Sequence, residues 1–135
     1  FGPDRNGTTA LMIALRNRKQ GVALALIQSG EGLGTWVDDS DSTPLHTACR
    51  DCRPGSEQLV EAMLKCKTVK TVTLNKQDCN GYSPLYVATA VNHVAAVKAL
   101  CSEMGLRPDL PDKQGWTPLH VAAQQGYGEV VEQLL

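Results

Sequence analysis

Aromatic side chains are scarce in this chain, at 4% of its 135 residues, with a single phenylalanine. A core must therefore be built from Leu, Val, Ala, Ile and Met, side chains small enough to suit thin helices packed closely in layers. The hydrophobic fraction of 42% is ordinary, which argues against a disordered chain.

Charge of one sign and long apolar runs are also lacking. The formal net charge is −1, and bulk attraction to nucleic acid usually requires a concentrated basic face, so no nucleic-acid partner is expected. Without an apolar run of about 18 residues, no membrane span is expected either. The chain has no G-x-S-x-G, H-E-x-x-H, Walker A or G-x-G-x-x-G motif. We therefore expect no catalytic residues, no cofactor and no metal.

The cysteines are few, odd in number and irregularly spaced. This pattern suits reduced thiols in a cytoplasmic or nuclear setting better than a disulfide framework. The five are Cys49, Cys52, Cys66, Cys79 and Cys101.

One short string recurs along the chain, and its copies start 34, 40 and 34 residues apart. The first copy is worn, and the other three share a hydroxyl residue, Pro, Leu, an aromatic ring and Ala. The copies are 9–14, 43–48, 83–88 and 117–122. Self-similarity at such a period is typical of a stacked repeat protein.

The first residues of the string have the chemistry of a helix start. Thr43, Ser83 and Thr117 suit N-caps, because a hydroxyl oxygen can accept a hydrogen bond from the first helical turn. The following Pro suits the first helical position. The Leu and Ala of each string lie one turn apart on one helix face, so both are expected to be buried.

A turn pattern precedes each string, and a second amphipathic stretch follows it. Asp78 with Gly81, and likewise Asp112 with Gly115, predict a hairpin turn before the string. The second unit has Asp41 in the place of this Gly. The apolar stretches 22–27, 59–64, 94–100 and 129–135 predict second helices. Asn92 and Gly126 fall between the helices, where a left-handed cap is needed. Extra residues in the second unit fall at 53–56 and 65–74, positions expected to be loops.

The string resembles the T-P-L-H-x-A signature of ankyrin repeats, whose period is about 33 residues. The resemblance covers almost the whole chain. It implies an all-α solenoid of stacked helix-turn-helix units joined by β-hairpin loops. It also implies one domain, 1–135, with repeats at about 4–37, 38–77, 78–111 and 112–135.

Two features at the edges of the chain led to a further expectation. The chain starts at Phe1 rather than Met, and it stops at Leu135 in an apolar helix, whereas solenoids need polar caps. We expect a piece of a longer protein.

His46, Cys49 and Cys52 allow a zinc reading, with the two cysteines resembling half a zinc knuckle. The resemblance instead gives the signature His a structural role linking turns and helices, and His93 a similar one. A structural zinc site also requires four ligands, so the structural reading is favoured.

The resemblance implies a concave binding face made by residues beside the hairpin Gly and just after the signature Ala. Tyr82 and Trp116 are equivalent in adjacent repeats and should lie side by side, and large aromatics dominate interface hot spots. A Trp116 that merely packs over its neighbouring hairpin is nearly as good a reading. The candidate partner-binding residues are Trp116, Tyr82, Arg16, Asn17, Arg50, Asp51, Asp39, Ser42, Lys113, Gln124 and Gln125.

The function implied is a protein–protein interaction module that presents this surface to a protein or peptide partner, as an isolated monomer. Alternatives are a regulatory or substrate-recruiting segment of a larger enzyme, channel or effector protein, and a purely structural spacer. A reader of methylated lysine requires an aromatic cage. Trp36 and Trp116 are about two repeats apart, which argues against a shared cage.

Overall fold

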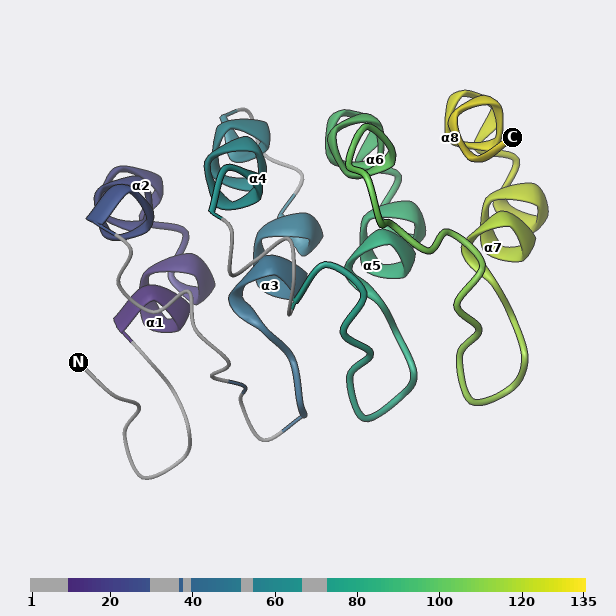
Figure 1. Cartoon of the computed structure of the whole chain (residues 1–135), viewed down its shortest axis with the longest axis horizontal. Helices are drawn as coiled ribbons and strands as arrows, with labels where there is room; N and C mark the ends of the chain where they lie inside the picture. The colour runs from purple at the N-terminus through teal and green to yellow at the C-terminus, as the bar shows by residue number, and fades with distance from the viewer. Residues whose placement is uncertain (1–9, 30–36, 38–39, 52–54, 67–72) are drawn as a thin grey trace.

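The computed structural model describes residues 10–29, 37, 40–51, 55–66 and 73–135. These residues form eight helices in two rows, and the loops at 73–83 and 106–117 project to one side of them (Figure 1). The inner row contains α1 (Ala10–Arg16), α3 (Pro44–Arg50), α5 (Pro84–Ala90) and α7 (Pro118–Gln125). The outer row contains α2 (Gln20–Ser29), α4 (Ser56–Leu64), α6 (Val94–Cys101) and α8 (Gly128–Leu134).

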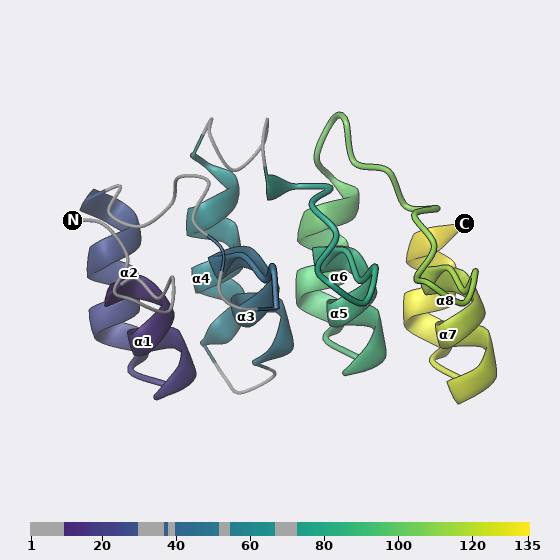
Figure 2. The ribbon, with the colours of Figure 1, turned by 90° about the horizontal axis from the view of Figure 1, so that it is seen from below.

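Each inner helix packs against the outer helix that follows it, and each helix also packs against its counterpart in the neighbouring pair (Figure 2). The result is a single stack of four helix pairs, as the sequence predicted. One hydrophobic cluster runs through the stack from Leu11 in α1 to Val130 in α8. An array of this kind buries its core between neighbouring units.

The predicted helix starts are confirmed in the second, third and fourth pairs. The side-chain oxygens of Thr43, Ser83 and Thr117 accept hydrogen bonds from the backbone N–H three residues later. A Pro occupies the first turn of each of these helices. These are the bonds that an N-cap hydroxyl is expected to make, so the string is a local helix-start signal.

The turns between paired helices use a left-handed residue, as expected. Asn92 has φ 57° and Gly126 has φ 75°. Gly55, with φ 91°, precedes α4, and Arg18, with φ 60°, follows α1. Arg18 was not foreseen, because left-handed backbone is uncommon outside Gly and Asn.

The loops leading into α5 and α7 are hairpin turns. In the first, the Asp78 N–H donates to the Tyr82 carbonyl at 3.0 Å, while Asp78 Oδ1 accepts from the N–H groups of Asn80 and Tyr82. Neighbouring hairpins are also joined, because the Lys113 N–H donates to the Asn80 carbonyl at 3.2 Å. Over the described ranges these hairpins contain no β-strand. Their backbone hydrogen bonds therefore close turns and do not form a β-ladder.

Burial of the signature Leu depends on its place in the stack. Leu45 and Leu85 are 1% and 0% exposed, but Leu119 is 37% exposed. The expectation that Leu119 is buried was therefore wrong. Leu45 and Leu85 belong to helices packed between two inner helices, whereas α7 packs against α5 and α8.

The extra residues of the second unit at 53–56 were expected to form a loop, and the structure differs at Ser56. Residues 52–54 lie outside the described ranges, but Ser56 is the first residue of α4 rather than part of a loop, and it is fully buried. Ser56 Oγ lies 2.8 Å from His93 Nε2. His93 Nδ1 accepts from the Ala96 N–H, so the neutral ring carries its proton on Nε2 and donates to Ser56. The pair links α4 to the start of α6.

No helix in the described part of the chain has the length and hydropathy to span a bilayer. Among the described cysteines, Cys49 is fully buried and Cys79 is exposed on a hairpin. None of the described cysteines is in a disulfide.

Candidate functional site

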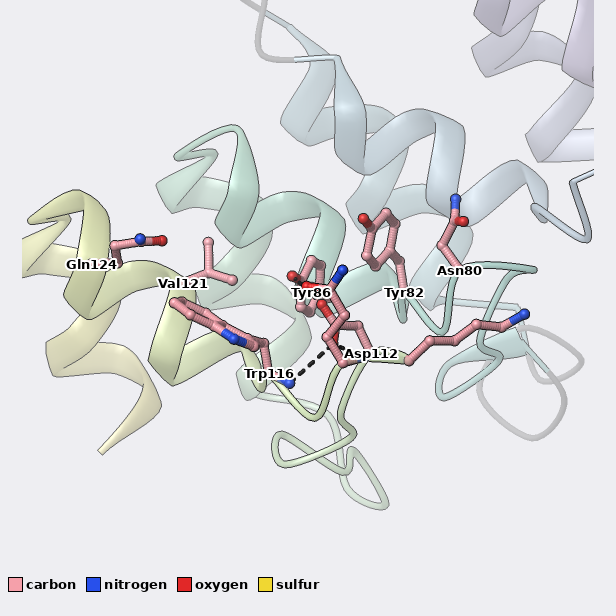
Figure 3. A pocket seen from close by; sticks show the side chains of 9 residues that line it. Asn80, Tyr82, Tyr86, Asp112, Trp116, Val121 and Gln124 are labelled. Atoms are coloured by element: carbon pink, nitrogen blue, oxygen red, sulfur yellow. Dashed lines mark hydrogen bonds between the residues drawn. The ribbon is translucent and has the colours of Figure 1, made fainter.

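Two adjoining hollows lie on the loop side of the inner helices, and they share Tyr82, Tyr86 and Val121. We call them together the aromatic groove. The first hollow, of about 520 Å³, is also lined by Asn80, Asp112, Lys113, Gln114, Trp116 and Gln124 (Figure 3). The second, of about 280 Å³, is also lined by Arg50, Val87, Ala90 and Val91.

A stacked pair of tyrosines stands between the two hollows. The rings of Tyr82 and Tyr86 are 4.5 Å apart between centroids and inclined by 8°. Tyr82 precedes the N-cap of α5 and Tyr86 is in its first turn, so the hairpin and the helix start each place one ring. In the next unit, the equivalent rings of Trp116 and His120 meet edge to face at 5.9 Å.

Tyr86 is joined to the next hairpin through its hydroxyl. The Tyr86 O–H donates to Asp112 Oδ2 at 2.8 Å. Burial, and after it the hydrogen bond to Asp112, raise the pKa of the Tyr86 phenol far above its ordinary value. The phenol is therefore a proton donor throughout the neutral range, and it ties the third helix pair to the fourth.

Asp112 organises the hairpin in which it lies. Its Oδ1 accepts from the Gln114 N–H at 2.8 Å and the Trp116 N–H at 3.0 Å. Burial alone would raise the pKa of the carboxyl, but the hydrogen bonds from Trp116, Tyr86 and Gln114 prevail and lower it. Both oxygens of this carboxylate are thus engaged in holding the wall of the groove.

His46 makes the corresponding link one unit earlier, with different chemistry. Its Nδ1 accepts from the Thr43 N–H at 3.1 Å, and its Nε2 then carries the proton and donates to the Tyr82 carbonyl at 2.7 Å. Burial lowers the pKa of His46 because the charged imidazolium is costly away from water. The ring is a structural connector, as the resemblance implied.

That role bears directly on the zinc reading. Both ring nitrogens of His46 are engaged, and Cys49 is fully buried in α3. Cys52 lies outside the described ranges. Among the residues that are described, no three His, Cys, Asp or Glu side chains gather as a metal site would require.

The predicted surface residues divide between the groove and other places. Trp116, Tyr82, Lys113 and Gln124 line the first hollow, and Arg50 lines the second. Trp116 and Tyr82 thus share a wall, with Tyr86 between them (Figure 3). Of the others, Arg16 and Gln125 are exposed, Asn17 lines a separate hollow beside α1 and α2, Asp51 caps α3, Ser42 is 3% exposed, and Asp39, like Trp36, lies outside the described ranges.

Sequence reasoning did not include Tyr86, Asp112 or Val121 among the candidates. The departure of Tyr86 from the signature His was the available signal for that residue. Asp112 had been read only as a turn residue. Its second oxygen reaches a tyrosine 26 positions away in the sequence, a contact that depends on tertiary packing.

Stacked helix pairs, hairpins on one side and an aromatic groove between the last two units define a helical repeat solenoid. The model of ankyrin repeats in three copies matches residues 1–73 and 52–135. The chain belongs to the ankyrin-repeat family, whose repeats are non-catalytic modules that bind other proteins.

Relatives of this chain are segments of much longer proteins. It is 29% identical over 126 residues to the putative palmitoyltransferase ZDHHC13 of Danio rerio, covering 93% of this chain and 18% of that protein. It is 33% identical over 100 residues to the human transient receptor potential cation channel subfamily A member 1, covering 73% of this chain and 8% of the channel. Mouse Rabankyrin-5 is 27% identical over 148 residues, covering 100% of this chain and 12% of its own length. The chain therefore spans less than a fifth of each of these proteins.

Proposed function

We propose that the aromatic groove is the surface through which this ankyrin array binds a segment of a partner protein. The observation that carries the proposal is the clustering of three large aromatic rings, Tyr82, Tyr86 and Trp116, around one hollow on the hairpin side. Trp116 remains 37% exposed in that position. Tyr and Trp are enriched among the residues that dominate binding energy, especially in pockets a partner can fill.

The groove is organised before any partner arrives. Tyr86, Asp112 and the hairpin N–H groups hold its wall by hydrogen bonds of 2.7 to 3.2 Å. Tyr82 is fixed by its stack on Tyr86 and by the bond from His46 to its carbonyl. A preformed surface spends little free energy on ordering itself, so more of the contact energy appears as affinity.

The wider role is proposed from the relatives. Segments similar to this chain occur within a putative palmitoyltransferase, a cation channel and Rabankyrin-5. We propose that this array is a segment of a larger protein and recruits a partner protein to it. Any catalytic activity would belong to other parts of that larger protein. We further propose that the array by itself is monomeric, that it does not bind nucleic acid, and that it works in the reducing cytoplasm or nucleus, as its net charge of −1 and its cysteine pattern suggest.

The test compares partner capture by three forms of the chain after crosslinking in a cell extract. Trp116→Ala combined with Tyr82→Ala should lose the partner, because it removes two of the three aromatic rings that line the hollow. Met104→Ala removes an apolar side chain that is 94% exposed outside the groove, and it should retain the partner. Captured proteins are then purified, and their affinity for each form is measured directly, with at least about a tenfold loss expected for the double variant.

Circular dichroism and thermal melting show whether the double variant remains folded. A folded double variant that binds with full affinity would place the site elsewhere. A wild-type chain with no partner in this assay would favour a structural spacer.

A further inference from the structure

Two cationic side chains stand at the groove. Arg50, in the last turn of α3, lines the second hollow, and Lys113, in the hairpin before α7, lines the first. Both side chains are exposed, and within the described ranges neither makes an ion pair or a side-chain hydrogen bond. Their charge is therefore available to a partner.

Among the described residues, Asp112 is the one acidic side chain that lines the groove, and its oxygens already accept hydrogen bonds. Its two oxygens accept bonds from the Tyr86 hydroxyl and from the N–H groups of Gln114 and Trp116. A carboxylate with three donors around it has less to offer an incoming cation. The charge that the groove presents is thus mainly positive, although the whole chain has a net charge of −1.

The remaining lining suits an extended main chain with one apolar side chain. The side-chain amides of Asn80, Gln114 and Gln124 line the first hollow. Over the described residues, these amides make no hydrogen bond. An amide both donates and accepts, as main-chain peptide groups do. The second hollow is instead lined mainly by apolar groups, including Val87, Ala90 and Val91.

From these contacts we infer that the partner segment is an extended, acidic peptide that pairs carboxylates with Arg50 and Lys113 and inserts an aliphatic side chain beside Val87 and Val91. This inference rests on the proposed function and adds the chemistry of the partner. Complementary charge gives an interface its specificity and speeds association, and both effects weaken with added salt.

A cationic segment fits the same surface less well. A cation bound by aromatic rings needs their open faces within about 6 Å. The Tyr82 and Tyr86 rings cover one face of each other. Arg50 and Lys113 would also repel a bound Lys or Arg side chain. The two cationic side chains therefore favour an acidic occupant.

A phage library of random linear peptides, panned on the whole 135-residue chain, tests the inference. Enriched peptides should carry net negative charge with an aliphatic residue among the acids. Arg50→Glu with Lys113→Glu should lower the affinity for a synthetic copy of an enriched peptide by at least about tenfold, and this loss should be largest at low salt. Lys98→Glu with Arg107→Glu makes the same charge change at two exposed residues outside the groove, and it should alter affinity by less than about twofold.

The outcomes separate this inference from the proposed function. Neutral or basic enriched peptides that still lose binding to Tyr82→Ala with Trp116→Ala would overturn the acidic partner and leave the groove as the site. Enriched peptides that bind all of these variants equally would overturn both, as would a library that yields no binder. Arg50→Gln with Lys113→Gln, which removes charge without reversing it, should give an intermediate loss.

Discussion

The sequence Thr-Pro-Leu-His occurs twice with identical letters, at 43–46 and 117–120, and the two copies lie in different surroundings. Both begin a helix in the same way, because Thr and His form a reciprocal capping box in each. Leu45 is nevertheless 1% exposed and Leu119 37%, and His46 is fully buried while His120 is exposed.

The difference separates local from tertiary information. The cap needs only residues within one turn, so it forms in both copies. Burial needs a neighbouring unit, and α3 packs between α1 and α5 whereas α7 packs against α5 on that row. The string therefore specifies where a helix starts, and the stack decides how much each of its side chains stabilises the fold.

The largest expected contrast is between the two leucines. Leu45→Ala should lower the free energy of unfolding by about 2–5 kcal/mol, because it leaves a cavity in a packed core. Leu119→Ala should cost less than about 1 kcal/mol, because much of that side chain already contacts water. Urea unfolding of both variants measures the difference. Equal losses would mean that burial in the stack does not set the contribution of this position.

The pH dependence of the free energy of unfolding should show a smaller contrast, between His46 and His120. His46 has its pKa lowered by burial, so the unfolded chain binds more protons once the pH falls below the ordinary value of 6.5. Stability should therefore fall as the pH drops from about 7.5 to about 5.5, by at most about 1.4 kcal/mol for one histidine. The unfolded chain takes up a proton on His46 in this range, whereas the folded chain keeps the buried ring neutral with Nδ1 accepting from the Thr43 N–H.

His46→Gln should remove part of that pH dependence, because Gln at this position can still cap but does not titrate. His120→Gln is the matched control and should leave the dependence on His46 in place. Unfolding midpoints at the two pH values provide the measurement. A slope that His46→Gln leaves unchanged would assign the effect to other groups.

The fold could be predicted much more fully than the site, and particular residues show why. Ser83 as a cap and Asn92 as a left-handed turn follow from chemistry within a few positions. Leu119 was misjudged because its exposure depends on packing partners. Tyr86 was missed because its value to the groove comes from a ring stacked on Tyr82 and a hydroxyl reaching Asp112, neither of which the repeat pattern encodes.

The third copy of the string sharpens the comparison, because Tyr86 stands where the second and fourth copies have His. Tyr86→Phe keeps the ring stack but removes the bond to Asp112, so it should lower the free energy of unfolding by about 0.5–1.5 kcal/mol. Tyr86→His restores the signature residue, and its Nε2 should reach the Trp116 carbonyl as His46 reaches that of Tyr82. Thermal melting should then rank Tyr86→His above Tyr86→Phe. The reverse ranking would show that the third unit has adapted to tyrosine, and that its link to the fourth is not interchangeable with the histidine link between the second and third.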